Sequence, residues 1–282
     1  MRRGIYLVEE VDFRPMSSRR PLEYLTWLTR YKKEDEGLDA PELTKGLSIR
    51  SREIDLVGAF YAVGITGHPQ FRAVTLWDCH GGWDGGWRQM MDIYDGVDDR
   101  LFLSDIDDLR FSAFSRPLGA VRGSPALADI TAEGYAAPFY LYESARVRPG
   151  AALDYLDAVR EERAPVLADH GHRPVGLYEV LFCDTEVVTI WGVSLDAHLA
   201  TQRARDAALG LDDEAEPDER LLAWGKRARD AALGLDDEAE PDERLLAWGK
   251  RARDFLDGPW RETLLAPFPG SRLSPVRDPS PA

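Results

Sequence analysis

The chain of 282 residues is long enough for two domains with a sizeable core, and its 44% hydrophobic and 30% charged residues are ordinary for a globular protein. A net charge of −15 disfavours nucleic acid and anionic membranes as partners, because like charges repel. No apolar run approaches the length of a membrane span, and the N-terminus reads as an alternating strand instead of a signal sequence. The two cysteines, Cys79 and Cys183, do not indicate a disulfide framework, so we expect a cytoplasmic protein.

The first half of the chain predicts a strand, a helix and a hairpin. Residues 5–13 alternate between apolar and polar side chains, which indicates a strand. Residues 21–31 carry leucines at helical spacing and predict a helix, and the segment 38–55 is interpreted as an insertion that forms a surface turn or lid. Residues 56–65 and 71–79 are rich in β-branched and aromatic side chains, which predicts a hairpin.

The stretch 78–87, at the end of this hairpin, contains four glycines, which weaken a helix and allow close approach of the backbone. The large side chains of Trp83 and Trp87, within this stretch, and of Met91 after it recur on one helical face. Such a stripe more often belongs to a core than to a pocket wall, and both interpretations stay open.

His80 is the candidate acid or base in this stretch. It lies on the same strand face as Asp78, and imidazole titrates near neutral pH. The functional interpretation is a catalytic pair in which Asp78 orients His80, beside a ligand-binding wall of Tyr61, Trp83, Trp87 and Met91. A structural role for His80 is an equally good interpretation. No strong metal-ligand spacing accompanies the histidines, so we expect no metal.

Residues 96–137 join the two halves. They are rich in aspartate but lack the spacing of a calcium loop, and prolines and glycines punctuate them. We predict a largely irregular acidic connector that wraps around the fold.

The second half repeats the order of elements. Residues 139–147 predict a strand and residues from 153 onward a helix, with Glu161, Glu162 and Arg163 expected to face solvent. A hairpin over 175–182 and 186–193 follows, and a helix begins after Ser194, which is a good N-cap. The two histidines before the hairpin, His170 and His172, are interpreted as residues that cap a loop.

Four short blocks recur in the same order in both halves, and the length changes fall between them. The pairs are Tyr6-Leu-Val-Glu9 with Tyr140-Leu-Tyr-Glu143, Leu22-Glu-Tyr-Leu25 with Leu153-Asp-Tyr-Leu156, Val57-Gly-Ala-Phe60 with Val175-Gly-Leu-Tyr178, and Val74-Thr-Leu-Trp77 with Val188-Thr-Ile-Trp191. Chance rarely preserves the order of four blocks, so we interpret the halves as an internal duplication.

A second repeat is of a different kind, because the 24 residues 203–226 recur without change as 227–250. Identity over this length points to a recent duplication or a constructed insertion. Each copy predicts a helix that begins at its proline, Pro217 or Pro241. We expect the second copy to dock, since Phe255 and Trp260 follow it directly, and the first copy to loop out and give a possible surface for self-association.

The motifs of the second half resemble the NIPSNAP family. They are Val147-Arg-Pro-Gly150, a helix, His170-Gly-His172, and a hairpin that ends in Val187-Val-Thr-Ile-Trp191. The resemblance covers residues 139–204 and, more loosely, 5–94. It implies the dimeric α/β-barrel superfamily: an α+β fold in which two tandem ferredoxin-like β-α-β-β-α units form one intrachain barrel.

We therefore divide the chain into five parts: an N-terminal ferredoxin-like unit, 1–95; a linker, 96–137; a NIPSNAP-like ferredoxin-like unit, 138–204; the duplicated helical segment, 205–258; and a C-terminal strap, 259–282.

Two classes of function follow from the resemblance. One is a small-molecule enzyme of the dimeric α/β-barrel type, which uses cofactor-free acid–base or oxygenation chemistry on an apolar or aromatic metabolite. The other is a non-catalytic NIPSNAP-like module that binds a ligand or another protein. Haem binding, known on related barrels, is a third possibility, and the family carries no general catalytic motif that would decide between them.

Overall fold

The computed structural model describes residues 4–14, 25, 55–63, 71–79, 81–85, 88, 110–208 and 241–276. Leu25 is helical and buried, as expected for the predicted helix over 21–31. The rest of that helix, the insertion 38–55 and the first repeat copy from 209 onward lie outside the described residues.

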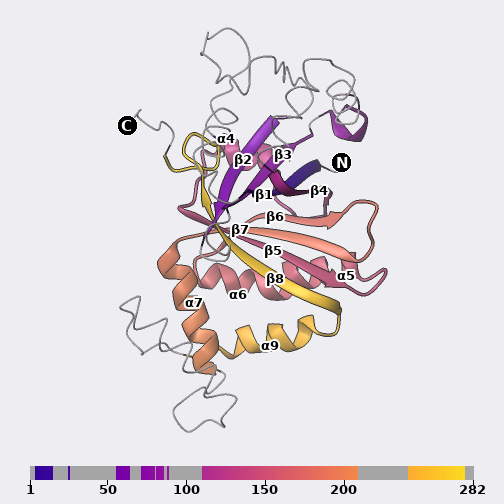
Figure 1. The fold of residues 1–282 in the computed structure, drawn as a ribbon. Helices are drawn as coiled ribbons and strands as arrows, with labels where there is room; N and C mark the ends of the chain where they lie inside the picture. Colours follow the sequence, from indigo (N-terminus) through magenta and orange to yellow (C-terminus); the bar gives the residue numbers. More distant parts are fainter. Residues whose placement is uncertain are drawn as a thin grey trace.

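Eight antiparallel strands close into a barrel in the order β1-β3-β2-β8-β5-β7-β6-β4. The strands are β1 Ile5–Phe13, β2 Asp55–Ala62, β3 Phe71–Asp78, β4 Arg110–Ala120, β5 Phe139–Val147, β6 Arg173–Val180, β7 Glu186–Val193 and β8 Leu256–Pro267. The helices are α4 Leu127–Ala132, α5 Ala152–Ala158, the π-helical turn η2 Val159–Arg163, α6 Ala164–Asp169, α7 Leu195–Ala208 and α9 Glu243–Ala252. Helices α5, α6, α7 and α9 lie together on the side of the barrel formed by the second half (Figure 1).

The barrel divides into two sheets with the same internal order. One is β4-β1-β3-β2 and the other is β8-β5-β7-β6, and they join where β2 pairs with β8 and β4 with β6. Leu7 is opposite Trp77 in the first sheet, and Leu141 is opposite Trp191 in the second. The two tryptophans therefore occupy matching positions in the register, as the repeated blocks predict.

Strands β4 and β8, the fourth strand of each sheet, correct the sequence interpretation. Strand β4 lies within residues 96–137, which the sequence predicted as an irregular connector. Strand β8 covers the end of the predicted helical segment 205–258 and the start of the predicted strap 259–282. In β4, all of residues 111–115 are exposed, so no apolar alternation marks the strand. In β8, Gly258 and Pro259 resemble a turn, but they lie where the register with β5 shifts, a position that tolerates proline.

The repeated Val-Gly-x-aromatic block has a structural reason in each sheet. Gly58 and Gly176 lie where the pairing of β2 with β3 and of β6 with β7 shifts register. The aromatic ring two residues later covers the glycine: an added Cβ would lie 2.4 Å from Cζ of Phe60 or 2.0 Å from Oη of Tyr178. No side chain larger than hydrogen fits there without displacing the ring.

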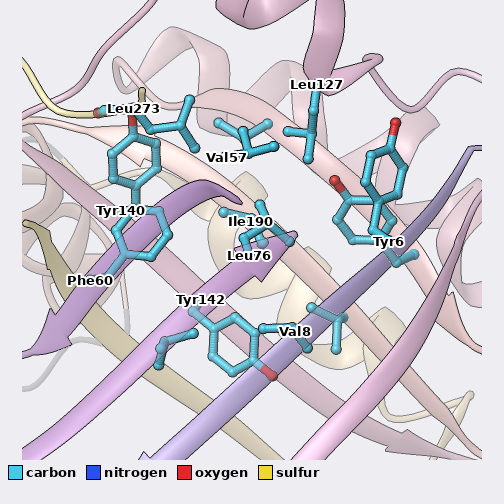
Figure 2. Close-up of a cluster of buried hydrophobic side chains, with 14 of the residues drawn as sticks. Tyr6, Val8, Val57, Phe60, Leu76, Leu127, Tyr140, Tyr142, Ile190 and Leu273 are labelled. Atoms are coloured by element: carbon cyan, nitrogen blue, oxygen red, sulfur yellow. Dashed lines mark hydrogen bonds between the residues drawn. The ribbon is translucent and has the colours of Figure 1, made fainter. Parts of the chain in front are cut away.

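Two cores hold the fold together. The first fills the barrel and includes Tyr6, Phe60 and Tyr140, which point into the interior from different strands (Figure 2). The second lies between the outer face of the second sheet and helices α5, η2, α6 and α9. Trp248 and Ala252, in the helix of the second repeat copy, belong to it, so this copy docks on the barrel as expected.

Candidate functional site

The site predicted in the first half is described only in part. His80, Trp87 and Met91 lie outside the described residues. Tyr61 pairs with Ala73 and stacks on Phe71, with a ring-centroid distance of 6.2 Å. Asp78 lies five residues beyond Ala73 along β3, about 16 Å at 3.3 Å per residue, so the structure does not bring Tyr61 and Asp78 together.

The other described residues of that prediction have different surroundings. Asp78 lies opposite Tyr6 at the end of β3, and its charge adds to burial in raising the pKa of Tyr6. Burial, then Tyr6 and then Asp78 raise the pKa of Tyr178. Trp83 is 45% exposed and packs edge-on against Phe182 at 4.9 Å between ring centroids. The notion of a catalytic pair at His80 and Asp78 stays a prediction.

A cavity of about 40 Å³ lies in the second half instead, between β5 and β8 on one side and η2, α6, α7 and α9 on the other. At roughly 10–15 Å³ per water-sized probe, it has room for about three water molecules. Its lining includes the polar groups of Arg163, His172, His198, Gln202, Arg205, Trp248, Trp260 and Glu262.

The innermost charged group is Glu143, at the middle of β5. Arg163 donates two hydrogen bonds to its carboxylate, one of them from Nη1 at 2.6 Å. Thr189 Oγ1 and Trp191 Nε1, both on the neighbouring β7, donate two more at 2.5 and 2.8 Å. Burial by itself would raise the pKa of Glu143, but the charge and hydrogen bonds of Arg163 hold it below its ordinary value. Glu143 is therefore a fixed negative charge.

Arg163 corrects the sequence interpretation, because it is buried instead of facing solvent. Its guanidinium carbon lies 5.5 Å from the ring centroid of Trp191, 5.7 Å from that of Trp248 and 5.0 Å from that of Trp260. Polarity alone suggested solvent, whereas the spacing of four residues from the buried Val159 places Arg163 on the inner face of the helix.

Glu262 is the second carboxylate and faces Glu143 directly across the β5–β8 pairing. Gln202 Nε2 lies 3.4 Å from its Oε1, and His198 Nε2 lies 3.8 Å from the same oxygen. Burial and the charge of Glu143 raise the pKa of Glu262 to about 7, against the opposing charges of Arg163 and Arg205. Glu262 consequently changes its protonation state near neutral pH.

One histidine of the cavity lining is kept neutral at pH 7. His172, expected to cap a loop, is 3% exposed and lines the cavity. Burial, the neighbouring His198 and the charge of Arg163 lower the pKa of His172 to about 4. Its Nδ1 is buried without a hydrogen-bond partner, and so are the indole nitrogens of Trp248 and Trp260. His170 instead binds Asp242, the N-cap of α9, at 2.9 Å.

The repeated blocks contained a signal for this site, since they carry Glu and Thr-x-Trp in both halves. In the first half, Thr75 Oγ1 donates to Glu9 at 3.3 Å, and Trp77 Nε1 donates to Thr75 at 2.9 Å. Ser115 faces Glu9 across β1 and β4, where the second half has Glu262. Of these two matching positions, only the one in the second half carries a second acid.

The lining does not fit a haem, since 40 Å³ is far below the roughly 300–1,000 Å³ of pockets that hold drug-sized ligands. Within the described ranges, no group of three His, Cys, Asp or Glu side chains could hold a metal ion. In that same part of the chain, no helix is long and apolar enough to cross a membrane.

The overall fold is similar to solved structures. An anthrone oxidase-like protein matches with a TM-score of 0.52 and 12% identity, covering 94% of this chain and 91% of the other. A "putative monooxygenase" from Fusobacterium nucleatum subsp. nucleatum matches with a TM-score of 0.50 and 9% identity, covering 94% of this chain and 93% of the other. An uncharacterised NIPSNAP domain protein from Burkholderia xenovorans matches 46% of this chain and 93% of its own, with a TM-score of 0.26 and 16% identity.

Matches at these identities show the fold alone. The chain thus has a closed antiparallel α+β barrel, a fold similar to those of the anthrone oxidase-like protein and of the "putative monooxygenase". No family model matches the sequence, and no curated protein does.

Proposed function

We propose that this protein is a small-molecule enzyme of the dimeric α/β-barrel type, with cofactor-free acid–base chemistry at the second-half cavity and Glu262 as the group that carries the proton. One observation supports this above all others. Two carboxylates face each other across β5 and β8, and their surroundings push the two pKa values in opposite directions. Such a divergence is typical of sites in which one acid stays ionised while the other exchanges protons.

The roles of the two acids follow from their contacts. Glu143 accepts four hydrogen bonds from Arg163, Thr189 and Trp191 and is not part of the cavity lining, so it serves as a fixed charge behind the site. Glu262, with a pKa of about 7, is present in both forms at neutral pH, which is the condition for efficient general acid–base catalysis. In its acid form it protonates the substrate, and as the resulting carboxylate it takes a proton back from a carbon of the substrate, which restores the acid form. Exchange of the acid proton with solvent leaves deuterium in the substrate. His172 stays neutral and orients groups through hydrogen bonds.

The cavity favours a small polar substrate over the apolar or aromatic metabolite expected from the sequence. Its volume of about 40 Å³ is too small for a ring system, and buried polar atoms of His172, Trp248 and Trp260 in its lining have no hydrogen-bond partner. An aromatic substrate remains a proposal for the first half, where Asp78 adjoins the aromatic interior. We also infer that the halves arose by duplication, and the matching registers of Trp77 and Trp191 support this. A cytoplasmic location fits the composition.

The second candidate function is a non-catalytic interaction module. The exposed pair Trp83 and Phe182, 45% and 81% exposed, favours it, since contacting large aromatic side chains on a surface are typical of binding sites.

Deuterium incorporation tests the enzyme proposal without knowledge of the substrate. The protein is incubated in D₂O with a panel of small keto, hydroxy and unsaturated acids, and mass spectrometry detects molecules that gain one mass unit. We expect incorporation with the wild type and its loss in Glu262→Gln. The control is Glu9→Gln, which changes the first-half counterpart of Glu143 and should leave incorporation intact, because Ser115 stands where the second half has Glu262. No incorporation by the wild type, or equal incorporation by Glu262→Gln, would contradict the proposal.

A further inference from the structure

We propose that the second-half cavity binds a small carboxylate of two or three carbons, held by the indole N–H groups of Trp248 and Trp260 and by the protonated carboxyl of Glu262. This inference rests on the proposed function, since it names the substrate class of the same site.

The unsatisfied donors of the cavity carry the argument. Trp248 and Trp260 both line the cavity, and the indole nitrogen of each is buried without a hydrogen-bond partner. Trp248 as a whole is only 6% exposed. An indole N–H can donate but never accept, and a buried donor without a partner is costly, so the group that completes this site must present acceptor oxygens. Two such donors in one cavity match the two oxygens of one carboxylate.

Packing against neighbouring side chains fixes the positions of these two indole donors. Trp248 packs on Tyr155 at 5.8 Å between ring centroids, and the Arg163 guanidinium lies over both indole rings. Helix α9, which carries Trp248, is fixed at its start by the hydrogen bond that the Asp242 carboxylate accepts from His170 and by the ion pair of Arg244 with Asp169. The donor set is thus built into the fold before any ligand arrives.

The charges around Glu262 decide how an anion can enter. Glu143 faces it from β5, Arg163 from η2, and His198 and Arg205 from α7, while His172 lies before β6. Asp206 lies 3.8 Å from Arg205 and offsets part of its charge. Ionised Glu262 would repel a carboxylate, whereas protonated Glu262 would donate a third hydrogen bond to it. Anion binding and proton uptake at Glu262 are consequently coupled.

Size restricts the ligand further. Space for about three water molecules accommodates acetate, with four non-hydrogen atoms, but not an aromatic acid. Acetamide has a similar shape, yet it replaces one acceptor oxygen by a donor that would face an indole N–H. Acetate and acetamide are therefore a matched pair of probes.

Calorimetric titration of the full-length protein with acetate tests the proposal. Between pH 6 and 8, in two buffers of different ionisation enthalpy, we expect constant affinity below pH 7 and about a tenfold loss per pH unit above it, with uptake of up to one proton. Acetamide should bind at least tenfold more weakly than acetate at pH 6. Glu262→Gln should retain affinity for acetate and lose both the pH dependence and the proton uptake.

Tryptophan variants separate recognition from folding. Trp248→Phe and Trp260→Phe should each weaken acetate binding about tenfold or more while the thermal transition stays cooperative. Trp77→Phe is the control, because its indole already donates to Thr75 in the other half, and its affinity should equal that of the wild type. Unchanged affinity in both cavity variants, an equal loss in Trp77→Phe, or equal binding of acetamide would overturn the proposal.

The two proposals fail separately. Acetate binding as described, without any deuterium incorporation, would contradict the proposed reaction and support the proposed ligand class. Deuterium incorporation that depends on Glu262, without acetate binding, would contradict the proposed ligand class and support the proposed reaction.

Discussion

Replacing Arg163 by methionine should reveal how strongly the site depends on its buried ion pair. Arg163 and Glu143 are both buried, with 6% and 2% of their side-chain surfaces exposed. Methionine keeps much of the apolar contact with the surrounding tryptophans but leaves Glu143 as a buried charge with only Thr189 and Trp191 as donors. Removing one partner of such a pair costs about 3–5 kcal/mol of unfolding free energy. Urea denaturation at pH 7, followed by circular dichroism, measures this loss.

The pH dependence of this loss gives an independent check. In the wild type, the pKa of Glu143 is lowered, so its stabilising contribution is present above the pKa of the unfolded chain and is lost as pH falls through the folded value. In Arg163→Met, burial dominates and raises that pKa, so the destabilisation should shrink as the pH falls. The double variant Arg163→Met with Glu143→Gln should recover much of the stability.

A surface pair supplies the control. Arg88 and Asp84 form an exposed ion pair, and Arg88→Met should cost about 0–1 kcal/mol. A loss below about 1 kcal/mol for Arg163→Met, or a double variant whose loss is the sum of the single losses, would refute the reasoning.

Three further outcomes are expected. Gly176→Ala should destabilise the protein by about 1–3 kcal/mol in urea denaturation, because the added Cβ would overlap Tyr178. Gly249→Ala, in α9, has open space around the added Cβ and should stabilise the protein by about 0.5–1 kcal/mol. Equal effects of the two substitutions would contradict the packing of the Tyr178 ring over Gly176. The raised pKa of Glu262 means that its ionised form destabilises the folded protein. Glu262→Gln should therefore have a higher melting temperature than the wild type at pH 8 but not at pH 4, with the difference developing between about pH 4.5 and 7. A melting-temperature difference that does not change with pH would argue against the raised pKa. Deleting residues 227–250 restores a single repeat copy. The shortened protein should keep its melting temperature and acetate affinity, and it should self-associate less when measured by analytical ultracentrifugation. A clear drop in melting temperature would show that both copies contribute to the fold.

The sequence predicted those strands whose two faces differ and whose blocks recur, and it therefore placed Trp77 and Trp191 correctly. It could not predict β4, because its exposed residues show no alternation, or the start of β8, because Gly258 and Pro259 imitate a turn. These two strands are also what complete the barrel.

The candidate site in the second half escaped prediction for a related reason. Glu143 reads as an ordinary polar residue of a strand and Glu262 as part of the predicted strap, and only their pairing across β5 and β8 makes them a coupled pair. That pairing joins residues 119 positions apart, which no local pattern encodes. Arg163 was within reach of the sequence, because its spacing from Val159 places it on the buried face of the helix.

The protonation of Glu262 is the most direct measure of the central claim. The protein labelled with ¹³C at the glutamate side-chain carboxyl carbons, with Glu262→Gln to assign the resonance, reports each titration by NMR. A single resonance that titrates near pH 7 and is absent from Glu262→Gln is the predicted result. A spectrum in which the Glu262 resonance titrates near pH 4.5, as in an exposed glutamate, would contradict it.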